Sequence, residues 1–139
     1  MEKIYIMKIS LHKSAGLVLI ILGGLHLHYY FTGPGPADLD ILASMQAYEI
    51  NIMGSHNLLQ FHSGFSVMMG IMLMIYGGLI WLTDQSEGIK VSRNTRIFNI
   101  VSCLVLSFIS FVYFHPLAYG FCLLAALLLA LSFYKTSRK

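Results

Sequence analysis

The sequence has few charged residues. Asp, Glu, Lys and Arg make up 11% of its 139 positions, whereas an ordinary soluble domain has about 25%. Hydrophobic residues make up 57%, and the mean hydropathy is +0.72. So few charges cannot cover the surface of a soluble domain of this size. The composition therefore excludes an ordinary soluble domain and indicates a chain that has the lipid bilayer as its solvent.

Cysteines and common cofactor motifs are also scarce. The two cysteines, Cys103 and Cys122, fall inside apolar runs at different expected depths, which argues against a disulfide and favours two small buried residues. No Walker, Rossmann, H-E-x-x-H or C-x-x-C pattern is present, and without C-x-x-C-H a covalent c-type haem is excluded. The net charge of +3 gives no case for nucleic acid as a partner, so membrane lipids are the expected surroundings.

Four long apolar runs dominate the sequence that remains. Each is near or above the roughly 18 to 20 residues that a helix needs to cross a bilayer. Helices are expected because lipid offers the backbone no hydrogen-bond partners. The sequence thus predicts an all-α fold, an integral membrane antiparallel four-helix bundle that forms a single domain over residues 1–139. The expected spans are residues 14–31, 58–82, 97–114 and 117–134.

All nine Lys and Arg residues fall in three segments that lie on one side of this four-span layout. The outer segment, residues 32–57, has none. By the positive-inside rule, we expect both termini to be cytoplasmic. The expected location is a bacterial inner membrane, which the chain crosses several times. A cleaved signal peptide is the alternative for the first run, although no A-x-A-like site follows it. The basic residues are Lys3, Lys8, Lys13, Lys90, Arg93, Arg96, Lys135, Arg138 and Lys139.

Small residues recur along the expected spans. Gly16 and Gly23 are seven residues apart in the first span, and Ser63, Gly70 and Gly77 repeat at the same interval in the second. Such ridges let membrane helices approach closely, so we expect the two spans to pack along them. The third and fourth spans offer similar sets, namely Cys103, Ser107 and Ser110, and Ala118, Cys122, Ala126 and Ala130.

The outer segment predicts a short amphipathic helix between the first and second spans. Asp38 or Asp40 would cap its start and Gly54 would end it. An apolar stripe runs along one of its faces. We expect this helix to lie along the outer membrane–water interface or to fold over the bundle mouth as a lid. The stripe consists of Ile41, Met45, Tyr48 and Ile52.

Five of the six histidines fall on the outer side, and only His12 is on the cytoplasmic side. His26 and His28 are about 200° apart around a helix, so His28 is expected to point away from the bundle. The predicted site is a pocket that gathers four histidines from different elements beneath one carboxylate. Its residues are His26, His56, His62, His115 and Glu49.

Several chemistries fit this histidine cluster. Imidazoles with a carboxylate suit a transition-metal ion such as zinc, iron or copper. His26 and His62 are the pair that would ligate a b-type haem, and a histidine beside Glu49 or Asp40 would be a general base. The alternatives are proton chemistry, or amphipathic interface residues within an aromatic belt that includes Tyr29 and Tyr30.

Several stretches carry a resemblance to known membrane proteins. They are "HKSAGLVLIILGGLHLHYYF", "LASMQA", "SGFSVMMGIMLMIYGGL" and "YFHPLAYGFCLLAALLLAL". From residue 14 to about residue 134, the layout resembles a small, uncharacterised bacterial family of four-pass membrane proteins. That resemblance implies a four-helix fold and carries over no catalytic residue. The compact layout is also similar to four-helix membrane cytochromes, but those often place haem histidines at two depths, whereas these favour one end.

The sequence therefore predicts a small inner-membrane binding or accessory protein with an outward-facing, histidine-rich polar pocket. Its ligand would be a metal ion, a lipid head group or a partner membrane subunit, and a homo-oligomer is the other expected assembly. The alternative, from a different functional class, is a small membrane enzyme or b-haem electron carrier that uses the same cluster.

Overall fold

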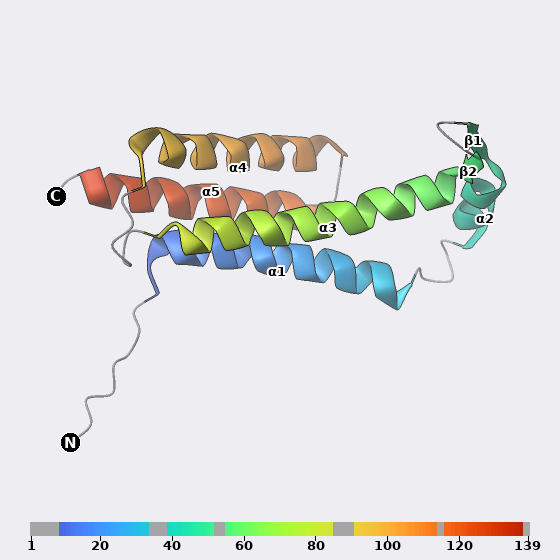
Figure 1. Cartoon of the computed structure of the whole chain (residues 1–139), viewed down its shortest axis with the longest axis horizontal. Helices are drawn as coiled ribbons and strands as arrows, with labels where there is room; N and C mark the ends of the chain where they lie inside the picture. Colours follow the sequence, from blue (N-terminus) through green and yellow to red (C-terminus); the bar gives the residue numbers. More distant parts are fainter. Residues whose placement is uncertain (1–8, 34–38, 52–54, 85–90, 114–115, 138–139) are drawn as a thin grey trace, which may run out of the picture. The chain divides into compact units, whose positions relative to one another are not determined.

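The computed structural model describes residues 9–33, 39–51, 55–84, 91–113 and 116–137. Five helices and one pair of short strands make up the fold within these residues (Figure 1). In chain order they are α1 (Leu11–Thr32), α2 (Leu39–Ala47), β1 (Glu49–Asn51), β2 (Ser55–Asn57), α3 (Leu58–Leu82), α4 (Arg93–Tyr113) and α5 (Pro116–Ser137).

The prediction of an all-α protein with four membrane-spanning helices is confirmed. α1, α3, α4 and α5 are each long and apolar enough to cross a bilayer. α3 has the predicted bounds, whereas α1 begins three residues earlier than expected and α4 begins four residues earlier. The chain is therefore a multi-pass membrane protein.

Side-chain caps explain where the helices begin. Ser10 Oγ accepts a hydrogen bond from the Lys13 backbone N–H at 3.1 Å, and Ser92 Oγ accepts one from Thr95 at 3.0 Å. A serine in this position satisfies one of the N–H groups that a helix start leaves unpaired. These caps let α1 and α4 begin in polar sequence, before the apolar runs from which their starts were predicted.

α3 begins with a reciprocal cap. The Gln60 N–H donates to Asn57 Oδ1 at 2.8 Å, and the Asn57 N–H donates to Gln60 Oε1 at 3.2 Å. This capping box ends β2 and starts the helix at Leu58.

The chain divides into two compact units, and each is described by itself. Unit 1 comprises Met1–Ile20 and Ile75–Lys139, and unit 2 comprises Ile21–Met74. Unit 1 therefore contains the first part of α1, the last part of α3, and all of α4 and α5. Unit 2 contains the rest of α1 and α3, with α2 and the strand pair between them.

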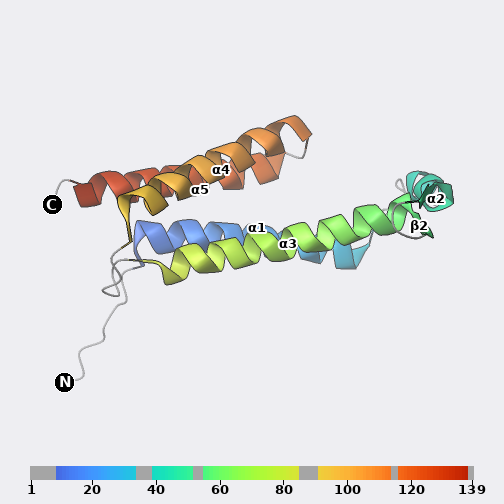
Figure 2. The ribbon, with the colours of Figure 1, turned by 45° about the horizontal axis from the view of Figure 1, so that its top comes forward.

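In unit 1, α4 and α5 pack side by side (Figures 1 and 2). The buried residues of α4 are small or polar, whereas Phe98, Val105 and Phe108 on the same helix are between 51% and 68% exposed. This polarity is the reverse of that of a helix in a water-soluble protein, as expected where lipid surrounds the helices. The buried residues of α4 are Asn99, Cys103, Ser107 and Ser110, and those of α5 are Cys122, Ala125, Ala126 and Leu129.

The predicted glycine ridges pack α1 against α3. In unit 1, a Cβ added to Gly16 would lie 2.5 Å from the Gly77 carbonyl oxygen, and the reverse substitution gives the same distance. In unit 2, a Cβ on Gly23 would lie 2.6 Å from the Gly70 carbonyl oxygen. Real Cβ atoms essentially never come this close to an oxygen. The backbones therefore approach so closely that only glycine fits at these positions.

The outer segment differs from the prediction. α2 ends at Ala47, and the chain then forms an antiparallel hairpin in which Glu49 pairs with Asn57 and Ile50 pairs with His56. The predicted helix is therefore wrong beyond Ala47, because the backbone after it bonds across to the start of α3, as in the hydrogen bond from Leu58 N–H to the Tyr48 carbonyl at 2.8 Å. Asp38, Ile52 and Gly54, which also figured in the predicted helix, lie outside the described residues.

Candidate functional site

A small polar cavity lies at one end of unit 1, where α1 and α4 begin and α3 and α5 end. Its volume is about 30 Å³, and we call it the end cavity. All four spans, or the residues next to them, contribute to its wall. The lining residues are His12, Thr83, Asp84, Val91, Arg96, Ser132 and Thr136.

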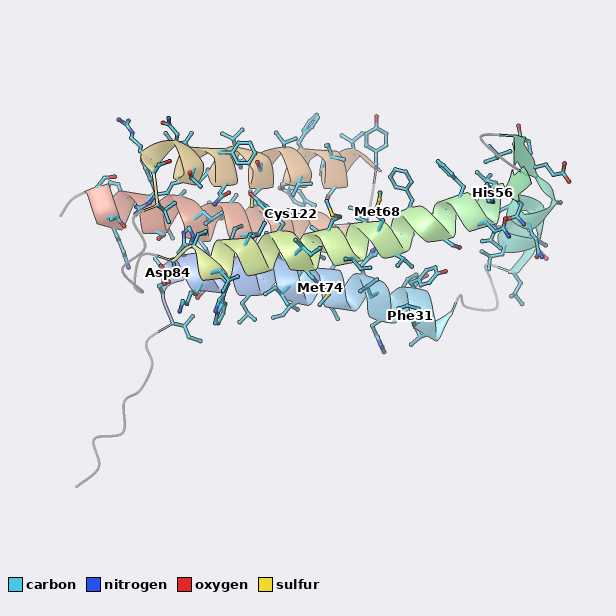
Figure 3. The ribbon with its side chains drawn as sticks, viewed as in Figure 1. Phe31, His56, Met68, Met74, Asp84 and Cys122 are labelled. Carbon is cyan, nitrogen blue, oxygen red and sulfur yellow. The ribbon has the colours of Figure 1, made fainter. Side chains whose placement is uncertain are left out.

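Asp84 is a buried carboxylate at this cavity, directly after α3 (Figure 3). Its side chain is 5% exposed, and one of its oxygens, Oδ2, accepts a hydrogen bond from Ser10 Oγ at 2.6 Å. Such a short O–H···O⁻ distance is typical of a charge-assisted hydrogen bond. Because Ser10 also caps α1, this one hydroxyl ties the start of α1 to the end of α3.

His12 is the second buried ionisable group, and it lies on the first turn of α1. The residue is 6% exposed, and its ring hydrogen-bonds the backbone of Ile80. The Nε2 atom is buried and has no hydrogen-bond partner within the described part of the chain. An unsatisfied buried polar atom costs about 1–3 kcal/mol. A cavity of about 30 Å³ has room for a water molecule, which needs roughly 10–15 Å³.

Two charges of opposite sign act on the His12 ring. The Asp84 carboxylate attracts a proton on the imidazole, and the Arg96 guanidinium repels it. The nearby Lys13 ammonium instead lies over the Trp81 ring, 5.5 Å from its centroid. A buried histidine between a carboxylate and a guanidinium, beside a water-sized cavity, is equipped to bind and release a proton.

The residues of the predicted outer pocket all lie in unit 2, except His115, which is outside the described residues. His56 and His62 are exposed, and Glu49 is exposed on β1. His26 is half-buried, and its Nε2 has no hydrogen-bond partner among the described residues. His28 is exposed, in keeping with its expected outward direction.

Metal binding by this set has no support in the described part of the chain. No group of three or more His, Cys, Asp or Glu side chains placed to hold a metal ion occurs among those residues. The five-residue site stays a prediction, since His115 is not among them.

His56 instead lines an open groove of about 340 Å³ beside the start of α3. Most of the wall is apolar, which suits contact with lipid chains in a bilayer. Figure 3 shows His56 and Met68 on this stretch of the chain. The lining residues are His56, Gln60, Phe61, Gly64, Phe65 and Met68.

The sequence analysis missed the His12–Asp84 site, although a signal was present. In an antiparallel four-span layout, residues 12, 84, 96 and 132–136 all fall at the same face of the membrane. In the sequence, His12 is the one histidine expected on the cytoplasmic side, and Asp84 falls in a polar loop that is expected to be solvated. The two residues are 72 positions apart, so only the packing of α1 against α3 brings them to one cavity.

Comparison with known proteins identifies no relative. No family model, no curated protein and no solved structure matches this chain.

Proposed function

We propose that the chain is a small multi-pass protein of a bacterial inner membrane that takes up and releases a proton at His12, at the cytoplasmic ends of its spans. The observation that carries the proposal is the buried, unpartnered Nε2 of His12, judged over the described residues, at a water-sized cavity shared with Asp84. Ionisable groups within membrane spans are costly to bury and often serve proton or ion pathways.

The surroundings of His12 support both charge states. The Asp84 carboxylate stabilises the protonated ring, whereas burial and the Arg96 guanidinium stabilise the neutral ring. Burial is the largest of these effects, and the Asp84 carboxylate opposes it, so both charge states of the ring have groups that stabilise them. The cavity that His12 lines has room for a water molecule, which would carry the proton.

Histidine-selective NMR of the protein in detergent micelles tests this proposal. The His12 signal, assigned by its loss in His12→Gln, should change between its two protonation forms over about pH 4 to 9, a range that brackets the ordinary histidine pKa near 6.5. Asp84→Asn should move that titration to lower pH, because the neighbouring negative charge is gone. His28→Gln is the matched control, since His28 is exposed on the same helix and should leave the His12 signal unchanged.

A His12 signal that stays in one form across the whole pH range would overturn the proposal. The proposal would also be contradicted if His12 titrated at the same pH in Asp84→Asn as in wild type. The carboxylate would then have no part in the site.

Binding at the outer pocket is the second candidate function, and the buried Nε2 of His26, without a partner among the described residues, favours it. The ligand would be a metal ion, a lipid head group or a partner subunit, and a Soret band would identify b-type haem. Titration of the purified protein with Zn²⁺ tests the metal. Weaker binding by His26→Ala and His62→Ala than by wild type supports it, and equal affinity in all three removes both histidines as ligands.

A further inference from the structure

A line of polar side chains continues from the end cavity along the buried face of α4, and we call it the polar file. Its members recur every three or four residues, which places them on one face of the helix. From first to last they span 14 residues, or about 21 Å at 1.5 Å per residue, of a hydrocarbon core about 30 Å thick. The file consists of Arg96, Asn99, Cys103, Ser107 and Ser110.

Side chains from α3 and α4 connect the first half of the file. The Tyr76 hydroxyl donates to Asn99 Oδ1 at 3.2 Å and also lies 3.5 Å from the Asn99 carbonyl oxygen. The same hydroxyl hydrogen-bonds the side chains of Ser102 and Cys103. Tyr76 therefore links two successive turns of the file.

Contacts with α5 continue the file beyond this point. Cys122 of α5 is buried, and it hydrogen-bonds the Ser110 side chain. Ser107 Oγ donates to the Tyr119 carbonyl oxygen at 3.4 Å. The polar contacts thus reach Ser110, one turn before α4 ends at Tyr113.

Close packing alone does not require this polarity. α5 packs against α4, and its buried residues include Ala125 and Ala126, which are no larger than serine. Hydrogen bonds between membrane helices contribute only about 0.6 kcal/mol on average. Alanines along α4 would pack as closely, so the run of amide, thiol and hydroxyl groups calls for a further explanation.

The independent observation that points to a moving proton is at the start of the file. Arg96 lines the end cavity together with His12, whose Nε2 is buried and unpartnered within the described residues. A buried titratable side chain that lines a water-sized cavity therefore lies where the file begins.

We propose that the polar file is a proton pathway between the end cavity and the opposite end of α4, and that the protein passes protons across the membrane. This inference rests on the proposed function, because His12 is the group that loads the file. A proton leaves His12 Nε2 for water in the cavity, and His12 becomes neutral. Each hydroxyl or thiol then accepts a proton from one side as it gives its own to the other, so every group ends unchanged. Arg96 promotes release from His12, and Asp84 stabilises its reloading.

Proton flux into liposomes tests the pathway. The full chain is reconstituted around a trapped pH-sensitive dye, and a potassium diffusion potential set with valinomycin drives protons inward. Wild type should acidify the lumen faster than empty liposomes. Tyr76→Phe removes only the linking hydroxyl, and a barrier raised by about 1.4 kcal/mol would slow the flux about tenfold. Tyr113→Phe is the matched control, because Tyr113 is 77% exposed and lies outside the file.

Each outcome bears on the pathway. Wild-type flux no faster than that of empty liposomes overturns it, while a titrating His12 signal would still support proton binding at the end cavity. Equal flux in Tyr76→Phe and wild type also overturns it. If Tyr76→Phe lowers both flux and melting temperature, Ser110→Ala decides: slowed flux in a variant that melts like wild type supports the file, and undiminished flux removes it. If proton flux in His12→Gln equals that of wild type, His12 does not supply protons to the polar file, and that step of the pathway is overturned.

Discussion

Ser10 has two structural roles through a single oxygen. Its Oγ accepts the Lys13 N–H that starts α1 and donates its own hydrogen to Asp84 Oδ2. In the sequence, Ser10 is a polar residue before an apolar run. The cap depends on neighbouring residues and was within reach of prediction, but the bond to Asp84 depends on a contact 74 positions away. Such a pairing follows only from the packed fold.

At this scale we predict that Asp84→Asn destabilises the protein. The amide loses the charge-assisted bond from Ser10, and hydrogen bonds to charged groups contribute about 1.5–3 kcal/mol. The melting temperature in detergent should therefore fall. Glu49→Gln is the control, since Glu49 is exposed on β1 and the same chemical change there should have little effect. Equal melting of the two variants would mean that Asp84 is not held as a carboxylate in the folded state.

The elements themselves were largely predictable. Glycines at intervals of seven residues identified the packed faces of α1 and α3. Close contact between helices in lipid requires small residues at the contact, so this pattern can be read from each helix alone. The hairpin of β1 and β2 was not predicted, because Tyr48 and Ile52 extend the apolar stripe of α2 and the helical pattern persists where the helix does not. Pairing with residues 55–57 overrides that local pattern.

Two adjacent glycines in α3 provide a matched test of helix packing. A Cβ on Gly77 would lie 2.5 Å from the Gly16 oxygen, whereas a Cβ on Gly78 meets nothing within 4 Å. Both changes to alanine raise helix propensity by about 1 kcal/mol. We therefore expect Gly78→Ala to melt at or above the wild-type temperature. Gly77→Ala should be destabilised by about 1–3 kcal/mol, the usual cost of overpacking.

The same comparison applies in unit 2 with Gly23→Ala and Gly24→Ala, where only the first would meet a neighbouring carbonyl oxygen. If both members of either pair melt alike, the two backbones do not approach as closely as the structure has them.

Across the whole molecule, the distribution of charge carried more information than any single motif. Four long apolar runs were enough to predict four spans, and the spans are confirmed. Nine basic residues in three segments predict how those spans are oriented. The functional site was harder to predict. The predicted outer pocket gathers several histidines that are expected on one side of the membrane, whereas the buried site uses His12, which is expected on the other side. The number of histidines in a segment can be counted from the sequence. Which histidine is buried, and which of its atoms has no partner, depends on three-dimensional packing.

For the whole chain, we predict that the end of α5 faces the cytoplasm and that the segment of residues 32–57 lies on the outer side. A reporter domain fused after Lys139 should be active only in the cytoplasm, and one inserted at Pro36 only on the outer side, because no basic residue lies in residues 32–57. A fusion that reports residue 139 on the outer side would contradict both the topology and the cytoplasmic placement of the end cavity.

The wall of the end cavity extends in sequence from His12 to Thr136, close to the last described residue. Ribosomes add about 5–20 residues per second, so on the order of ten seconds separate the synthesis of His12 from that of Thr136. During that interval His12 has been made but the wall of the end cavity is incomplete, even if the earlier helices have already inserted. The cavity thus forms only after the last turn of α5 has been made. A transcript that ends within α5 before its final turn would yield the first three spans without a complete wall around His12.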